Sequence, residues 1–148
     1  MEKNYEYIVS ACLCGEKVRY DGKAQTVDKI KKLCEEGRAL PICPEILGGL
    51  SVPRQPCEIK DNKVINKLGE DKTENFIKGG EQVFELCKKY NIKKAILKEK
   101  SPSCGSNHIY DGNFTRELIK GQGITAKLLM DNGIEVISDE EFILKDSD

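Results

Sequence analysis

Short apolar runs alternate with segments of helical periodicity along this chain, and this alternation limits the possible folds more than any other feature. The apolar runs have the length of buried strands, and they cover residues 7–9, 39–42, 93–98 and 134–137. The segments between them carry apolar residues at helical spacing. The pattern predicts an α/β protein with one mostly parallel, Rossmann-like sheet and helices on both of its faces.

Residues 58–59 and 64–65 form two further apolar stretches, separated by four polar residues. Their spacing predicts a small hairpin inserted outside the main sheet. Pro41 lacks a backbone donor, so it places the second strand at an edge or makes it end there. Neither an internal repeat nor a linker-like segment interrupts the 148 residues, which predicts a single domain.

Two pairs of residues have the spacing of a helix capping box. Asp71 with Glu74, and Ser138 with Glu141, each combine an N-cap residue with a glutamate three positions later. The first pair precedes a helical face that includes Val83. We therefore expect one helix to begin at each pair.

The charge balance excludes several classes of protein. A net charge of −1 gives no basic footprint for nucleic acid, and no apolar run approaches the length of a membrane span. The N-terminal residues 1–5 are polar and lack the apolar core of a secretion signal. These features predict a cytoplasmic protein that binds neither nucleic acid nor membrane.

Seven cysteines accompany a single histidine. Because a reducing cytoplasm argues against disulfides, we expect metal ligands, a redox thiol or buried packing residues. Cys34 and Cys87 lie on or beside predicted apolar helix faces, which favours packing roles. Cys57 precedes the hairpin and is interpreted as structural. Cys14 is interpreted as filler, with an accessory ligand or a reactive thiol as alternatives.

Cys12, Cys43 and Cys104 each follow the end of a predicted strand. Residues 101–106 (SPSCGS) cannot form a helix interior or a central strand, so Cys104 lies on a stiff loop. Ligands of parallel sheets bind beyond the carboxyl ends of the strands, where these three thiols would meet. Thiolates select zinc, copper(I) or iron–sulfur clusters, and His108 could complete a zinc site. The spacing alone leaves metal binding and scattered thiols both open.

Several short motifs together resemble the thiouracil desulfurase family. They are SACL (10–13), RYDG (19–22), CPE (43–45), LGG (47–49), PR (53–54), SPSCG (101–105) and IYDG (109–112). The resemblance spans about residues 9–141 and implies one desulfurase-like domain over 1–148. It implies an oxygen-sensitive [4Fe-4S] cluster bound by Cys12, Cys43 and Cys104, with the substrate sulfur on the fourth iron. The sequence departs from the family pattern at Cys14 and Cys57.

The resemblance also implies which residues act on the substrate, a small thiolated nucleobase or nucleotide resembling 2-thiouracil. Glu45 and Ser101 fall at catalytic positions, and Glu45 would act as a general base in a hydrolytic, non-redox exchange of sulfur for oxygen. Ser103, Arg19 and Asp21 are candidate substrate-binding residues.

Some of these side chains have alternative partners, and a further residue lies near the substrate. Arg19 and Arg54 could hold an anion, or pair with Asp21 or Glu45. Arg116 lies in a loop that could touch the substrate.

Other classes of protein fit the residues less well. Enzymes of the phosphatase-like thiol class place five residues between cysteine and arginine, whereas six residues lie between Cys12 and Arg19 and four between Cys14 and Arg19. A non-catalytic iron–sulfur or zinc-binding protein remains the alternative. The neutral charge balance disfavours a sensor that binds DNA.

Overall fold

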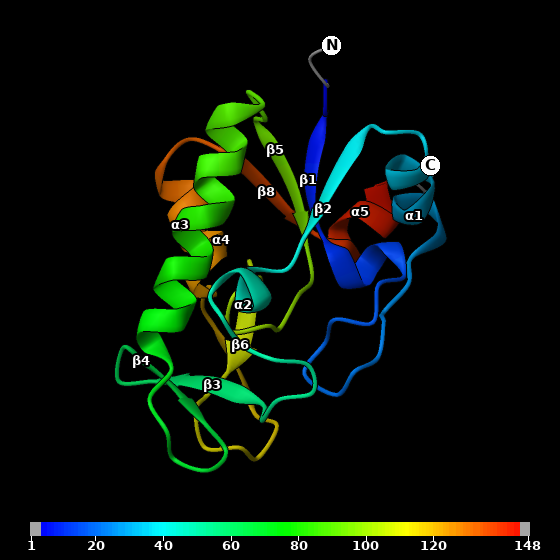
Figure 1. Cartoon of the computed structure of the whole chain (residues 1–148). Coiled ribbons are helices and arrows are strands. Elements are labelled where there is room, and N and C mark those ends of the chain that lie inside the picture. The colour runs from blue at the N-terminus through cyan, green and yellow to red at the C-terminus, as the bar shows by residue number, and fades with distance from the viewer. Residues whose placement is uncertain (1–3, 146–148) are drawn as a thin grey trace.

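The computed structural model describes residues 4–145, so the first three residues of the polar N-terminal segment lie outside the described part. Four parallel strands form the central sheet in the order β2-β1-β5-β8 (Figure 1). They are β1 (Tyr7–Ser10), β2 (Ala39–Ile42), β5 (Lys94–Leu97) and β8 (Glu135–Ser138). The predicted α/β class is confirmed, and β2 with Pro41 is an edge strand as expected.

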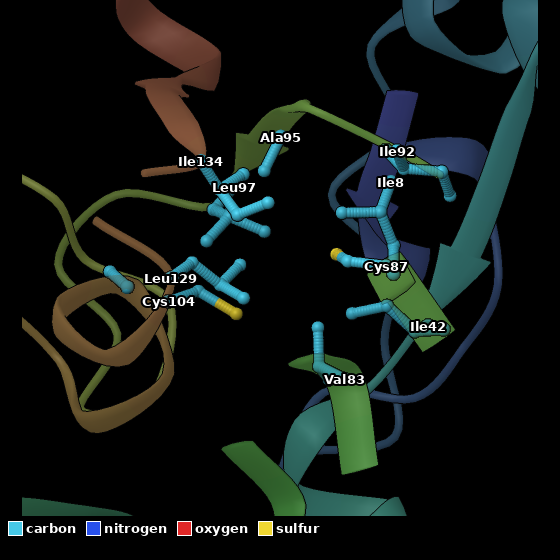
Figure 2. Packing of buried hydrophobic residues seen from close by; sticks show 11 residues of the cluster. Ile8, Ile42, Val83, Cys87, Ile92, Ala95, Leu97, Cys104, Leu129 and Ile134 are labelled. Carbon is cyan, nitrogen blue, oxygen red and sulfur yellow. The ribbon is translucent and has the colours of Figure 1, made fainter. Parts of the chain in front are cut away.

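Helices cover both faces of this sheet (Figure 1). They are α1 (Asp28–Glu35) and α5 (Asp139–Lys145) on one face, and α3 (Thr73–Lys89) and α4 (Ile124–Asp131) on the other. Successive strand residues point to opposite faces, so Ile8 packs with α3 and α4 while Val9 packs with α1. Figure 2 shows the cluster around Ile8, in which each fully buried aliphatic side chain contributes about 1.5–3 kcal/mol.

Two antiparallel hairpins lie at the carboxyl end of the sheet (Figure 1). The predicted one pairs β3 (Cys57–Lys60) with β4 (Lys63–Asn66), and its turn residues Asp61 and Asn62 adopt positive φ values of 51° and 65°. The second pairs β6 (His108–Tyr110) with β7 (Leu118–Lys120), and the sequence pattern did not predict it. No helix among residues 4–145 is long and apolar enough to cross a membrane.

One capping-box prediction is confirmed and the other is wrong. Ser138 N donates to Glu141 Oε1, and Glu141 N donates to Ser138 Oγ, both at 3.0 Å. Helix α3 instead begins at Thr73 with Lys72 at its N-cap. Asp71 accepts a hydrogen bond from Thr73 N at 2.9 Å, and the Thr73 hydroxyl in turn accepts one from Val64 N at 2.9 Å. These side chains therefore attach the start of α3 to β4.

A very close approach joins α3 to the short helix α2 (Pro44–Leu47). A Cβ atom at Gly79 would collide with the carbonyl oxygen of Pro44, and one at Gly48 would collide with that of Asn75. The Asn75 amide also donates to Gly48 O at 2.9 Å. Glycines at these positions therefore let α3 hold α2, and with it the preceding Cys43, against the sheet.

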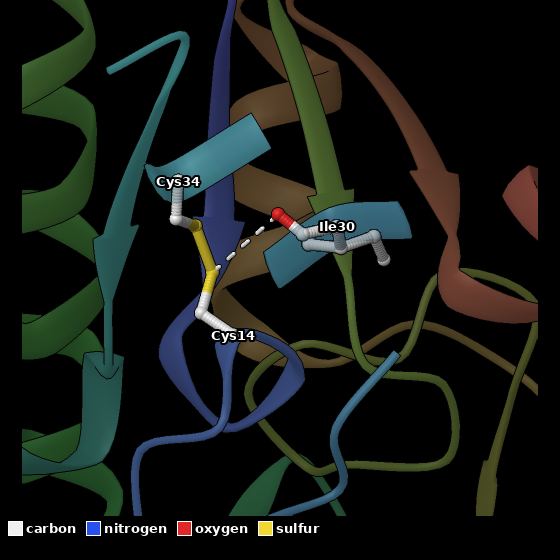
Figure 3. Close-up of a disulfide and its surroundings, with 3 residues drawn as sticks. All are labelled: Cys14, Ile30 and Cys34. Carbon is white, nitrogen blue, oxygen red and sulfur yellow. Dashed lines mark hydrogen bonds between the residues drawn. A yellow bond between two sulfur atoms is a disulfide. The ribbon is translucent and has the colours of Figure 1, made fainter. Parts of the chain in front are cut away.

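Cys14 and Cys34 form a disulfide with an S–S distance of 2.04 Å (Figure 3). This corrects the interpretation of Cys34 as a packing residue and of Cys14 as filler, and the expectation that the chain has no disulfide. Cys14 ends the 3-10 helix η1 (Ala11–Cys14), which packs on α1. That packing of two elements separated in sequence brings the two sulfurs together, and no local pattern reveals it.

Candidate metal centre and substrate pocket

A cavity of about 480 Å³ opens where β1, β2 and β5 end. Cys12, Cys43 and Cys104 all line it, although they come from three separate segments of the chain. Cys12 lies in η1, Cys43 is the N-cap residue of α2, and Cys104 lies in the loop after β5. Cys12 and Cys104 are buried, and Cys43 is half-buried.

The turn that carries Cys104 is organised by Ser101. The Oγ atom of Ser101 accepts hydrogen bonds from the backbone N–H groups of Ser103 and Cys104, at 3.1 and 3.0 Å. Gly105 N donates to Ser101 O at 2.9 Å, and a Cβ at Gly105 would lie 2.8 Å from that oxygen. A hydroxyl and a glycine at these two positions therefore determine the path of the loop.

Glu99 holds the part of the same loop that follows Cys104. Its Oε1 atom accepts backbone hydrogen bonds from Ser106, Asn107 and His108, each at 3.1 Å. Burial raises the pKa of the Glu99 carboxyl, but hydrogen bonds from His108 N and from Asn107 lower it more, and the net pKa is below its usual value. Sequence reasoning missed this residue, since its partners are known only from the fold.

The N-terminal turn of helix α4 holds the backbone of the loop that carries Cys104. Ile124 N donates to Pro102 O at 2.9 Å, and Ala126 N donates to Ser103 O at 3.0 Å. A Cβ at Gly123 would lie 2.5 Å from the carbonyl carbon of Ser103. The free amides of the first helical turn thus bind loop carbonyl groups, and this fixes the backbone on either side of Cys104.

The three thiols influence one another electrostatically. The pKa values of Cys12 and of Cys104 are raised to about 12, mainly by burial and in smaller part by the charge of Cys43. Burial likewise raises the pKa of Cys43. Cysteine thiolates are the ligands of iron–sulfur clusters, so the three sulfur donors around one cavity could hold all but one position of a four-iron cluster, and a cationic centre would stabilise the thiolates that burial disfavours. The residues therefore fit such a group.

A single-ion site is a different arrangement. Within residues 4–145, no three His, Cys, Asp or Glu side chains are grouped to hold one metal ion. His108, the candidate zinc ligand, is exposed on β6 and does not line the cavity.

A buried ion pair lies in the wall of the cavity. Arg54 Nε lies 3.0 Å from Glu45 Oε1, and the two side chains are 7% and 14% exposed. The remaining guanidinium nitrogens donate to Val18 O and Ser51 O, both at 3.0 Å. Arg54 is therefore held in one orientation and orients Glu45 in turn.

Glu45 is connected to the Cys104 loop through Ser103. The Ser103 hydroxyl lies 3.3 Å from Glu45 Oε2, 3.0 Å from Ser101 Oγ and 3.6 Å from Cys104 Sγ. A chain of polar contacts thus runs from the carboxylate to the cysteine sulfur.

Seven of the eight residues singled out from the sequence line this one cavity, and Asp21 does not. The seven are Cys12, Arg19, Cys43, Glu45, Ser101, Ser103 and Cys104. Asp21 instead accepts a hydrogen bond from Lys23 N at 3.0 Å and lies 3.8 Å from Arg19. The Arg19 guanidinium also donates to Gln25 at 2.9 Å.

The cavity has further lining residues, most of which the sequence did not identify as functional. Cys57 lies in its wall, as do Lys98 and Glu99. Tyr110, Phe114 and Arg116 reach it from the loop region of the second hairpin. The IYDG motif and the expectation for Arg116 pointed to this region, but nothing local indicated Phe114.

A parallel α/β sheet with three thiols and a buried carboxylate at its carboxyl end has the features of a candidate metal-dependent enzyme. Residues 7–141 match the family model of 2-thiouracil desulfurase, and the chain belongs to that family. The family resemblance seen in the sequence is confirmed.

Two relatives cover nearly the whole chain. The uncharacterized protein YbbK of Bacillus subtilis (strain 168) is 42% identical in an alignment of 144 residues, and the match covers 90% of this chain and 95% of YbbK. A solved structure of TudS, a [4Fe-4S]-dependent thiouracil desulfidase, is similar with a TM-score of 0.89 and 43% identity. The match covers 95% of this chain and 94% of TudS.

Proposed function

We propose that this chain removes sulfur from a thiolated pyrimidine such as 2-thiouracil, with a [4Fe-4S] cluster held by Cys12, Cys43 and Cys104. The observation that carries the proposal is the meeting of these thiols, from three strand ends, around one cavity. The family of the chain and its similarity to TudS support the same activity. When bound, the cluster supplies an iron without a protein ligand, a Lewis acid that binds soft sulfur and polarises the C–S bond.

Glu45 is the proposed general base. Its Oε1 is fixed by Arg54, and its Oε2 faces the Ser103 hydroxyl, so the carboxylate has one defined position in the cavity wall. From there it takes a proton from water as the new C–O bond forms. The C–S bond breaks and sulfur leaves as sulfide, so atoms and electrons balance without an oxidant or reductant.

The two serines have different proposed roles. Ser101 binds two backbone amides through Oγ, so we assign it to positioning the Cys104 turn and the Ser103 hydroxyl. Ser103 is near enough to Glu45 and to Cys104 to pass a proton or to donate to sulfur. We therefore assign Ser103 as the hydroxyl that contacts the substrate.

Of Arg19 and Asp21, one is also a proposed substrate contact and the other a positioning residue. Arg19 lines the cavity and is the proposed substrate contact. Asp21 lies outside the lining but 3.8 Å from Arg19, so it acts through the arginine by orienting its guanidinium.

The whole chain, residues 1–148, is proposed to act as one desulfurase-like domain in the cytoplasm. Its proposed partner is a small thiolated nucleobase or nucleotide. The near-neutral net charge of −1 supports a partner other than nucleic acid.

Anaerobic sulfide release from 2-thiouracil by cluster-loaded protein tests the proposal. We expect turnover by the wild type, and a kcat lower by about 10²- to 10⁴-fold in Glu45→Gln with unchanged iron content. Glu81→Gln, on the exposed face of α3, is the matched control and should behave like the wild type. A cluster-loaded wild type that releases no sulfide would instead indicate a non-catalytic iron–sulfur protein.

A further inference from the structure

The loop between β6 and β7 has an unusual backbone. Gly112, Phe114 and Arg116 have φ values of 95°, 57° and 65°. The left-handed region suits glycine, but it is unfavourable for an aromatic residue or an arginine, by about 1–2 kcal/mol per residue in a helix of that hand. Such conformations persist only where surrounding contacts hold them.

Glu58 is the group that holds this loop. It lies on β3, is 8% exposed and accepts hydrogen bonds at Oε1 from Gly112 N at 3.0 Å and from Phe114 N at 3.1 Å. The Lys60 ammonium donates to the Asn113 side chain at 2.9 Å. A Cβ at Gly112 would lie 2.7 Å from Ile59 O, so the loop lies directly on the strand.

The contacts bring Phe114 to the cavity and not to the core. Phe114 is half-buried and lines the same cavity as the three cysteines. It belongs to none of the three hydrophobic clusters found within residues 4–145. Phe114 is thus held at positive φ by a buried carboxylate, and its ring does not pack in the hydrophobic core. The ring is therefore available to contact a ligand.

We propose that Phe114 is the wall on which the flat ring of the substrate stacks, and that Glu58 is its positioning residue. Flat heteroaromatic rings stack on aromatic side chains without requiring a particular pattern of ring substituents. The wall therefore selects a planar ring, while the open iron of the cluster that the three thiols would hold selects sulfur. This inference rests on the proposed desulfuration and adds the residue that binds the ring.

Steady-state kinetics with 2-thiouracil test the role of Phe114. In cluster-loaded Phe114→Ala, KM should rise about tenfold, while kcat and iron content stay near wild type. Phe114→Tyr keeps the ring and should restore the wild-type KM. Leu118→Ala, on exposed β7 outside the cavity lining, is the control and should leave KM unchanged.

The role of Glu58 is tested by a double-mutant cycle. Glu58→Ala releases both amides and should raise KM to the level of Phe114→Ala, whereas Glu58→Gln keeps an acceptor oxygen and should rescue most of the loss. In the double variant of Glu58→Ala and Phe114→Ala, KM should be no higher than in either single variant, because both changes remove the same stacking contact. If the KM of the double variant rises by the product of the two single-variant factors, the two residues act independently and the positioning role is overturned.

The outcomes separate this inference from the function on which it rests. If the wild type turns over 2-thiouracil and Phe114→Ala keeps the wild-type KM, the stacking wall is wrong and the desulfuration stands. If the loaded wild type releases no sulfide, the proposed function itself fails. Product binding gives a readout without turnover, since uracil should bind the loaded Phe114→Ala variant about tenfold more weakly than the wild type.

Discussion

Arg54 and Glu45 form a buried ion pair, with Nε and Oε1 3.0 Å apart. Arg54 comes from the loop before β3 and Glu45 from the first turn of α2, so the pair also connects the hairpin to the segment that carries Cys43. A guanidinium with three hydrogen-bond partners is rigid, and it keeps the carboxylate aimed into the cavity.

Breaking this pair should destabilise the protein strongly. Arg54→Met leaves the Glu45 charge buried and uncompensated, so we expect a loss of about 3–5 kcal/mol in the free energy of unfolding. Adding Glu45→Gln to that variant should recover part of the loss. Urea unfolding measures both, with Arg38→Met at the exposed Glu6 pair as a control of little effect. If Arg54→Met alone and Arg54→Met combined with Glu45→Gln lose the same free energy of unfolding, the account is contradicted.

Gly79 should not tolerate a methyl group, although it lies inside a helix. Alanine normally stabilises a helix by about 1 kcal/mol relative to glycine. Here the added Cβ would collide with Pro44 O, so Gly79→Ala should lower the free energy of unfolding by about 1–3 kcal/mol and move Cys43. Glu81→Ala on the same helix should be nearly neutral. Thermal unfolding and cluster yield together check the prediction, and a stabilised Gly79→Ala variant would refute it.

Acid should weaken the protein partly through Glu99. Its pKa is lowered in the folded state, so its contribution to stability is present above the unfolded value of about 4.3 and is lost as pH falls through the folded value. Denaturation of the cluster-free protein between pH 6 and pH 3 measures this loss. Glu99→Gln should flatten the dependence below about pH 4.3, whereas Glu140→Gln at an exposed site should not. Parallel curves for Glu99→Gln and the wild type would refute the assignment.

The Cys14–Cys34 disulfide should stabilise the protein when it is formed. It closes a loop with a sequence separation of 20, for which chain entropy gives about 3 kcal/mol. Peptide mapping of alkylated, air-purified protein should find this pair linked, and reduction or Cys34→Ser should lower the melting temperature. Cys87→Ser, at a buried free thiol, separates the effect of the bond from that of losing a sulfur. A melting temperature that does not respond to reductant would refute the prediction.

The sequence predicted the parallel sheet because alternating apolar runs and helical segments leave few other topologies. The meeting of Cys12, Cys43 and Cys104 followed from it, since parallel strands end at one edge. Glu99, Glu58 and the disulfide could not be predicted, because their partners lie in other loops or helices. The capping box predicted at Asp71 does not form, because the Asp71 carboxylate accepts a hydrogen bond from Thr73 N while the Thr73 hydroxyl accepts one from Val64 N on β4.

Iron and sulfide analysis of anaerobically reconstituted protein tests the central claim most directly. Single changes to serine at Cys12, Cys43 and Cys104 should each lower the iron and sulfide content and the release of sulfide from 2-thiouracil. Cys87→Ser, whose thiol lies in the core and outside the cavity lining, should retain a full cluster. If all three pocket variants keep as much iron and sulfide as the wild type, these cysteines do not hold the cluster.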